Sequence, residues 1–242
     1  MSSIVRRDTL RSQLADALRD EILAGRLAPG QNITVKQLAE QYGVSATPVR
    51  EALVDLAGQG LLDVEEHRGY AVHSFTADDF RTMVQARAVV FEGIFRSSCQ
   101  GIPHAATPAA VAAMRRRGEE AERAAKAGDL DVLVHYDLRF WREIGRLAGN
   151  PYLSEFLHGI RVRCWVFAVP LLRDRPDLTS VFWQSQGALV DAIEQRDTAA
   201  AESIIRTHNE HSLALIERLT TAAEAGDDYA GTAPDADPGF PG

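Results

Sequence analysis

The feature that most constrains the fold is a pair of helical patterns separated by only two residues. The first, VKQLAEQY, can be capped by Thr34 and ends at Gly43. The second covers about residues 45–58 and carries apolar side chains on one face. Its Pro48 falls in the first turn, where a missing N–H has no intrahelical partner to lose. Two helices joined by so short a turn are typical of a helix-turn-helix.

The segments on either side extend this motif. Before it, apolar residues recur at helical spacing from Thr9 to Ala24, and GRLAPGQ then breaks the pattern. After it, residues 61–75 form two β-prone runs around EEHRG, which predicts a hairpin. This order is that of a winged helix-turn-helix, whose second helix enters a DNA major groove. The alternative is a small helical domain that uses the same pieces for packing alone.

The rest of the chain is patterned almost entirely as helix, and the protein is predicted to be mainly α. Six helical segments separated by caps and breakers are predicted at residues 76–98, 107–128, 129–150, 151–169, 179–197 and 198–226. They predict an antiparallel bundle of six or seven helices. The expected domains are residues 1–75 for DNA binding and 76–225 for effector binding and dimerisation. Residues 226–242, rich in Gly, Pro and Asp, are expected to be a disordered tail.

Composition narrows the class of protein. No apolar run approaches the roughly 20 residues that span a bilayer, and the first residues lack a signal-peptide core. We therefore expect a cytoplasmic protein without a membrane partner. Cys99 and Cys164 are the only cysteines of the 242 residues and show no metal-like spacing. The formal net charge of −8 argues against polyanion binding by the whole surface, but a local patch can still bind DNA.

Three stretches resemble one known family. They are GRLAPGQNITVKQLAEQYGVSATPVREALVDLAGQGLL, DLRFWREIGRLAGNPYL and GALVDAIEQRDTAAAESIIRTH. The chain resembles GntR-family transcription regulators of the FadR branch over about residues 9–222. This resemblance implies a winged helix-turn-helix followed by an all-helical ligand-binding domain of the FCD type. The expected function is a metabolite-released repressor that binds a palindromic operator as a homodimer.

The residues expected to contact DNA lie on the second helix, the helix before it and the wing. They are Lys36, Ser45, Thr47, Arg50, His67, Arg68 and Gly69. The Arg50 guanidinium can donate two hydrogen bonds to guanine or clamp a phosphate. Its alternative role is an ion pair with Glu51 or Glu65. Ser45 could instead only cap its helix, and Lys36 could be merely solvated.

Four positions modify this DNA surface. Many relatives carry an arginine where this chain has Ala46, so a contact expected in those relatives is lost. Glu65 and Glu66 add negative charge to the wing. Gly69 could serve the hairpin turn or let the wing backbone approach the minor groove. We expect moderate affinity per subunit, recovered when two subunits bind together.

The resemblance also implies a divalent metal held in the bundle by one aspartate and three histidines. Those four positions align with Asp137, Trp141, Gln186 and His208 in this chain. An indole only donates hydrogen bonds and cannot ligate a metal. We therefore expect no metal cofactor, with Asp137, His208 and His211 as the weak candidates that remain. The alternative is that His208 hydrogen-bonds Asp137 or Gln186 in a polar pocket.

An effector pocket is then expected inside the bundle. Its predicted lining is Arg87, Asp137, Trp141, Gln186 and His208, with Arg161 or Arg163 as outside candidates. An arginine in such a pocket suggests a ligand with a carboxylate or phosphate, hence an anionic metabolite. Two other functions compete with this one: a constitutive DNA-binding dimer, and a helical enzyme using Asp137 and His208. The sequence contains no Gly-rich phosphate loop, HExxH pair or nucleophile elbow.

Overall fold

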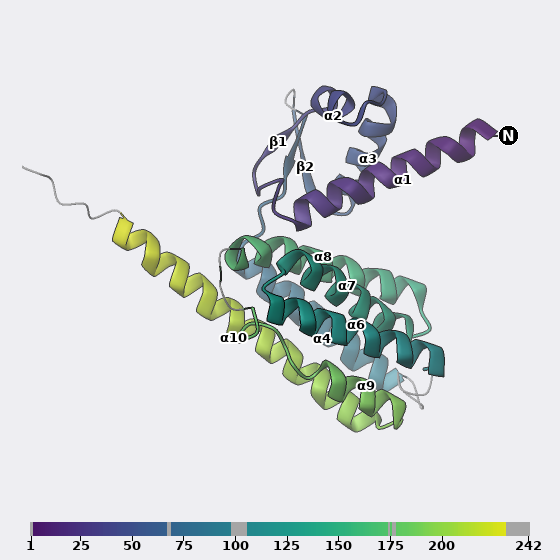
Figure 1. Ribbon diagram of the computed structural model, residues 1–242, viewed down its shortest axis with the longest axis vertical. Helices are drawn as coiled ribbons and strands as arrows, with labels where there is room; N and C mark the ends of the chain where they lie inside the picture. Colours follow the sequence, from purple (N-terminus) through teal and green to yellow (C-terminus); the bar gives the residue numbers. More distant parts are fainter. Residues whose placement is uncertain (1, 67–68, 98–105, 174, 176–177, 231–242) are drawn as a thin grey trace, which may run out of the picture.

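The computed structural model describes residues 2–66, 69–97, 106–173, 175 and 178–230. Figure 1 shows two parts, an N-terminal unit of helices and a small sheet, and a larger helical bundle. The chain passes between them through a short segment that ends at Thr76. The structure is mainly α with a winged helix-turn-helix at its N-terminus, so the predicted fold class is confirmed.

The N-terminal unit packs three helices against a three-stranded sheet. The helices are α1 Ser2–Leu23, α2 Val35–Tyr42 and α3 Ala46–Gly58, and the strands are β1 Asn32–Ile33, β2 Leu62–Glu65 and β3 Gly69–Val72. The strands are antiparallel in the order β1-β3-β2. Leu18, Leu53 and Leu56 lie in the core between α1 and α3. The hairpin is as predicted, but the sequence did not predict β1.

Local chemistry fixes the turn between α2 and α3. Thr34 and Gln37 form a reciprocal capping box at the start of α2. Gly43 ends α2 with a φ of 64°, a left-handed conformation that glycine adopts without a Cβ penalty. Ser45 occupies the N-cap position of α3, yet its side chain accepts no capping hydrogen bond. Pro48 lies in the first turn of α3, as its missing N–H requires.

The bundle contains six helices within the described residues. They are α4 Ala77–Ser97, α6 Pro108–Ala127, α7 Leu130–Arg146, α8 Pro151–Leu172, α9 Gln186–Glu194 and α10 Thr198–Ala230. Thr107 and Asn150 cap α6 and α8, each of which has proline at the start of its first turn. The packed pairs include α6 with α7, α7 with α8, and α4 with α10. The buried apolar side chains form two clusters. One extends from the bundle into the N-terminal unit, and the other surrounds Phe140.

Several predicted boundaries were wrong. α1 begins at Ser2 rather than Thr9, and α8 continues past Pro170 to Leu172. α9 begins at Gln186, because residues 179–185 form irregular turns whose apolar side chains pack into the bundle. α10 extends to Ala230, so the tail expected from residue 226 does not start there. A glycine inside a helix costs only about 1 kcal/mol, and Gly226 does not end this one.

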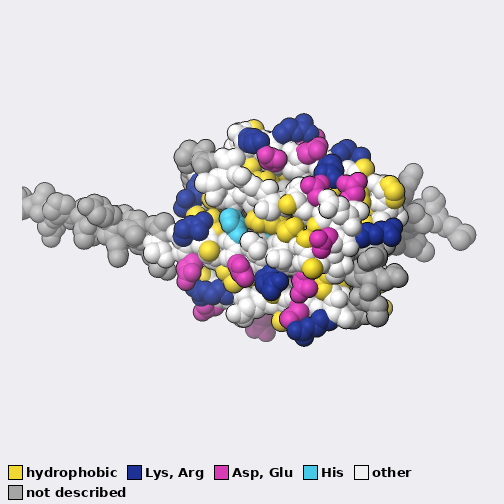
Figure 2. Space-filling model, turned by 90° about the horizontal axis from the view of Figure 1, so that it is seen from below, with side chains coloured by type: hydrophobic (Ala, Val, Ile, Leu, Met, Phe, Trp, Pro, Cys, Tyr) yellow, Lys and Arg dark blue, Asp and Glu magenta, His cyan; other side chains and the backbone are white. Residues whose placement is uncertain are grey.

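No described helix is both long enough and apolar enough to cross a membrane. Figure 2 views the molecule from the end opposite the N-terminal unit, with acidic and basic side chains interspersed on the visible face. A face of mixed charge lacks the concentrated positive potential that attracts a nucleic acid. A DNA surface is therefore better sought at the other end, on the N-terminal unit.

Candidate DNA interface and effector cavity

The leading edge of α3 is a polar surface open to solvent. Ser45, Thr47 and Arg50 are all exposed on it, and Lys36 is exposed at the start of α2. Arg50 forms no hydrogen bond or ion pair with any described residue, so its expected competitors, Glu51 and Glu65, do not hold it. Its guanidinium keeps all its donors for an external partner. These four side chains are accessible on the surface of the helix-turn-helix, and their contact with DNA stays a prediction.

The backbone geometry of the wing requires a glycine at position 69. Gly69 has a φ of 100°, and a Cβ built on it would lie 2.8 Å from the Ile33 carbonyl oxygen of β1. That contact is closer than real Cβ atoms make, so only glycine fits between β3 and β1 here. The sheet alone accounts for this residue, whether or not the wing reaches DNA. His67 and Arg68, also predicted to contact DNA, lie outside the described residues.

A cavity of about 80 Å³ lies inside the bundle. Its walls come from α4, α7, α8 and α10 and from the irregular segment before α9. The polar side chains of its lining are Arg87, Asp137, Arg161, His208, His211 and Ser212. Most of the other walls are apolar, among them Phe80 and Phe182. The cavity therefore combines a cluster of polar groups with a hydrophobic surround.

The centre of the polar cluster is a buried ion pair between α7 and α8. Arg161 donates from Nε and Nη2 to the two carboxylate oxygens of Asp137, at 2.8 and 2.6 Å. Trp165 donates from Nε1 to the same carboxylate at 2.6 Å. Asp137 and Arg161 retain only 3% and 7% of their surface exposed. A bidentate pair with an added donor satisfies both carboxylate oxygens, which a buried charge requires.

His208 completes this cluster from α10. The Nη1 of Arg161 lies 2.9 Å from its Nε2. A guanidinium only donates, so Nε2 accepts and the ring proton sits on Nδ1. Burial, followed by the charge of Arg161, holds the pKa of His208 well below its ordinary value of 6.5. The ring is therefore neutral at pH 7, and its Nδ1 is buried with no hydrogen-bond partner.

Trp141 stacks on one face of the His208 ring. The two rings stack at 4.5 Å with 24° between their planes, and the Arg161 guanidinium lies 4.5 Å from the indole centroid. This geometry gives a cation–π contact to the arginine. The indole Nε1, like Nδ1 of His208, is buried without a hydrogen-bond partner.

Arg87 brings a second buried cation from α4. Its Nε donates to the Asn209 side-chain oxygen at 2.9 Å and its Nη2 to the Ser212 hydroxyl at 3.4 Å. Its Nη1 has no acceptor among the described residues. Burial lowers the pKa of Arg87 to about 10, which leaves it charged at neutral pH. Two guanidiniums against the single carboxylate of Asp137 give these groups a surplus of one positive charge.

The structure brings together three of the five predicted effector residues. Arg87, Asp137 and His208 line the cavity; Trp141 lies behind His208 and outside that lining. Gln186 does not line this cavity: it is buried beside Gly118 and lines a separate pocket of about 70 Å³. Sequence reasoning missed Trp165, Asn209 and Ser212. The last two could have been found, because polar residues interrupt the inward apolar stripe of α10 one turn apart.

Helix α8 also contacts the N-terminal unit. Figure 1 shows it as the bundle helix beside α1. Arg163, two residues after Arg161, donates from Nε to the Gln59 carbonyl at 2.9 Å. Gln59 is the C-cap of α3, where a cation is favoured by the helix dipole. Arg173, which follows α8, donates in the same way to the Ala24 carbonyl just after α1.

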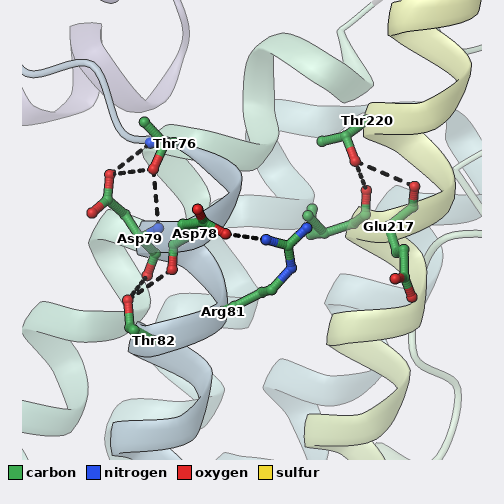
Figure 3. Close-up of polar contacts among 8 residues, drawn as sticks. Thr76, Asp78, Asp79, Arg81, Thr82, Glu217 and Thr220 are labelled. Carbon is green, nitrogen blue, oxygen red and sulfur yellow. Dashed lines mark hydrogen bonds and ion pairs between the residues drawn. The ribbon is translucent and has the colours of Figure 1, made fainter.

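The first bundle helix is fixed directly after the junction. Thr76 and Asp79 form a reciprocal pair, with the Thr76 N–H donating to Asp79 at 2.8 Å and the Asp79 N–H donating to Thr76 at 3.1 Å (Figure 3). This is a capping box that uses an aspartate. Figure 3 also shows Arg81 paired with Asp78 on the side of α4 that faces α10. The start of α4 is thus capped by its own side chains where the chain enters the bundle.

Comparison with known families agrees with this architecture. One family model, "Bacterial regulatory proteins, gntR family", matches residues 10–72, and the "FCD domain" model matches residues 82–211. The chain belongs to the GntR family. Its second part is an FCD domain, and the two matches cover the N-terminal unit and most of the bundle.

Individual relatives are similar over most of their length. The chain is 29% identical over 202 residues to a probable D-xylose utilization operon transcriptional repressor of Paenarthrobacter nicotinovorans, covering 84% of this chain and 86% of that protein. It is 27% identical to the repressor GlaR of Escherichia coli, covering 79% and 88%. Among solved structures, E. coli McbR/YncC has the same fold, with a TM-score of 0.72, 21% identity, and coverage of 86% and 97%.

This GntR-family protein is a DNA-binding transcription regulator and not an enzyme. The geometry is consistent with that conclusion, because Asp137 and His208 do not form an acid–base dyad. Both instead contact Arg161, which lies between them and holds the carboxylate. The guanidinium occupies both carboxylate oxygens and the acceptor nitrogen of the imidazole, so no hydrogen bond joins Asp137 to His208.

The family metal site does not fit these residues. Its ligand positions hold Asp137 and His208, but both oxygens of the carboxylate and Nε2 of the imidazole face Arg161. A divalent cation would have to displace this guanidinium or lie against it. His211 lies 3.3 Å from the Val181 carbonyl. Within the described part of the chain, no three His, Cys, Asp or Glu side chains cluster as metal ligands.

We expect the purified regulator to contain no stoichiometric transition metal. The physical reason is that an internal cation already neutralises Asp137 and occupies the acceptor nitrogen of His208. Elemental analysis of protein prepared without chelators measures this directly. About one zinc, nickel or manganese ion per chain, lost in the variant His208→Ala, would contradict the expectation.

Proposed function

We propose that two copies of this chain bind a palindromic operator and repress transcription until a small anionic metabolite enters the bundle cavity. The observation that supports an anionic ligand is the surplus of positive charge and of unpaired donors at the cavity. Such a ligand would accept hydrogen bonds that no described residue provides. As a regulator of bacterial genes, the protein is expected to work in the cytoplasm.

A homodimer is proposed because each chain presents one recognition helix with few cations. Lys36 and Arg50 are the exposed basic residues of α2 and α3, and Glu51 and Asp55 oppose them. Few phosphate contacts give weak binding at physiological salt. Two subunits whose recognition helices lie about one turn of DNA apart, roughly 34 Å, recover affinity and read a symmetric site.

Helix α8 offers a route between the two parts. It carries Arg161 at the cavity and, two residues later, Arg163 on the C-terminal carbonyl of the recognition helix. A ligand that shifts Arg161 would move the helix that holds Gln59. Tilting of α4 behind its short junction is a second route. In either case the ligand weakens operator binding only by its difference in affinity for the two states.

Replacing Arg50 with Ala should weaken specific operator binding by roughly 1–3 kcal/mol, about 5- to 150-fold, because a base or phosphate contact is lost. Binding is measured by fluorescence anisotropy on an operator fragment selected in vitro. The control is Arg81→Ala, which removes an exposed arginine from α4, in the bundle. Folding is checked by circular dichroism, since Arg50 makes no contact that the fold needs. Unchanged binding by folded Arg50→Ala protein would remove this residue from the interface.

The proposal as a whole is tested by operator release. Metabolites are first screened for those that raise the melting temperature, because only a ligand preferring the native state does so. Each stabilising ligand is then added to the protein–operator complex. Release by at least one of them supports the sensor. If all of them bind yet leave operator affinity unchanged, the protein is a constitutive DNA-binding dimer.

A further inference from the structure

Building on the proposed effector site, we propose that the ligand is a small monocarboxylate with an apolar body. Arg87 would bind its carboxylate, and the apolar walls would enclose the rest. The buried Arg161–Asp137 ion pair would lie where the family site has a metal and would supply the polar surface beside the ligand.

The acceptor groups of Asp137, His208 and Asn209 already take part in hydrogen bonds, whereas donors remain. Asp137 accepts from Arg161 and Trp165, His208 accepts at Nε2, and the Asn209 oxygen accepts from Arg87. The Nη1 donor of Arg87 has no acceptor among the described residues. The buried Nδ1 of His208 also lacks an acceptor. An ionised carboxylate only accepts hydrogen bonds, so it complements this set better than a hydroxyl or an amide, which would add donors of their own.

The charge balance favours a single carboxylate. Arg87 and Arg161 contribute two positive charges and Asp137 one negative charge, so one added anion makes these groups neutral. A dicarboxylate or tricarboxylate would bury negative charge with no partner, which is strongly unfavourable. Arg161 is held at three points by Asp137 and His208. Arg87 is therefore the cation available to a ligand.

The apolar side chains of the remaining cavity walls determine which kind of ligand body can be buried there. They are Phe80, Leu133, Leu172, Val181, Phe182, Leu215 and Ile216, with Trp165 and Trp183 beside them. A sugar hydroxyl buried against such walls lacks partners, at a cost of about 1–3 kcal/mol for each unpaired group. A hydrocarbon chain or ring gains from the same burial. The D-xylose operon named for one relative therefore does not indicate a sugar ligand for this chain.

The volume limits the size of the ligand. Since one water needs about 10–15 Å³ of such space, a cavity of about 80 Å³ has room for about six water-sized groups. Hexanoate and benzoate, each a carboxylate on a short apolar body, are suitable probes. Fatty acids of long chain and coenzyme A esters are too large for a cavity of this volume.

Isothermal titration of the full-length chain, with EDTA present throughout, tests the class of ligand. The probes are hexanoate, benzoate, the neutral isostere hexanamide, citrate, gluconate and D-xylose. We expect hexanoate or benzoate to bind at least tenfold more tightly than hexanamide, and the other three not to bind. Arg87→Gln should reduce the preference for acid over amide to about one, whereas the exposed-site control Arg81→Gln should retain it. Arg87→Lys, which keeps a cation, should recover part of it.

The outcomes separate this inference from the proposed function. Binding of gluconate or D-xylose with operator release would overturn the ligand class but leave the sensor intact. Binding of hexanoate with no effect on operator affinity would support the class and overturn the sensor. Equal binding of hexanoate and hexanamide, or binding of none of the probes, would overturn the class. If Arg87→Gln does not fold, the acid–amide comparison on the natural protein still decides.

Discussion

Replacing Asp137 with Asn should destabilise the protein by about 3–5 kcal/mol, because it leaves two buried guanidiniums without an anion. The Asp137 and Arg161 side chains retain only 4% and 8% of their surface. Their attraction is therefore little screened by solvent, and neither charge can reach water when its partner is removed. Native domains are stable by only about 5–15 kcal/mol, so the loss is a large part of the total. Urea unfolding followed by circular dichroism measures it.

Two further variants make this result specific. Glu92→Gln removes an exposed pair with Arg96 one helical turn away and should change stability by less than about 1 kcal/mol. The double variant Asp137→Asn with Arg161→Met removes both charges and should be more stable than Asp137→Asn alone. If Asp137→Asn costs no more than Glu92→Gln, the pair does not act as a buried one.

The N-terminal unit was predictable because its signals are local. Thr34, Gly43 and Pro48 each determine backbone geometry within one turn of their own position, and the structure follows them. Strand β1 could not be found in the same way. Its two residues pair with Ala71 and Tyr70, far along the chain, and two residues carry no periodicity.

The start of α9 shows tertiary packing overriding a local pattern. Thr179 followed by apolar residues at helical spacing predicted a helix from that point. In the structure Leu178, Val181 and Trp183 are buried in an irregular segment that closes one side of the cavity. Burial of large side chains outweighs the few tenths of a kcal/mol by which helix propensity acts at each residue.

The residues of the candidate cavity were predictable only in part. Asp137 and His208 were found through the family resemblance, and both line it. The sequence could not decide between Arg161 and Arg163, because residues two apart on a helix point to different sides. One turned out to hold Asp137 and the other to hold the end of α3. Which arginine faces the cavity depends on how α8 packs between the bundle and the N-terminal unit. No local sequence pattern indicates that packing.

Lowering the pH from 7.5 to 5.0 should destabilise the protein through two histidines that are buried in their neutral form. Burial, followed by the charge of Arg142, lowers the pKa of His158 to about 4. Burial also holds the pKa of His208 well below its ordinary value. In the unfolded chain both rings titrate near pH 6.5. Between about pH 6.5 and 4 the unfolded state therefore binds more protons than the folded state.

The sign of the effect follows from this difference in proton binding. Stability is fully present above about pH 6.5 and is lost as the pH falls toward the folded-state pKa values. At pH 5 each ring should account for about 1–2 kcal/mol of lost stability, the smaller value applying to His158, which keeps partial contact with solvent. Urea midpoints at pH 7.5, 6.0 and 5.0 measure the total.

Single variants assign the loss to each ring. Between pH 7.5 and 5.0 the free energy of unfolding of the natural protein should fall by about 1–2 kcal/mol more than that of His158→Gln or of His208→Gln. The reason is that glutamine does not titrate. Thr207→Gln adds a glutamine at an exposed position of α10 without removing a histidine, and should follow the natural protein at every pH. If the His208→Gln curve also runs parallel to that of the natural protein, the pKa of His208 is not lowered by burial and by Arg161. The donor count of the cavity would then include a ring that gains a proton near pH 6.5, which below that pH would still favour an anion but no longer a single carboxylate.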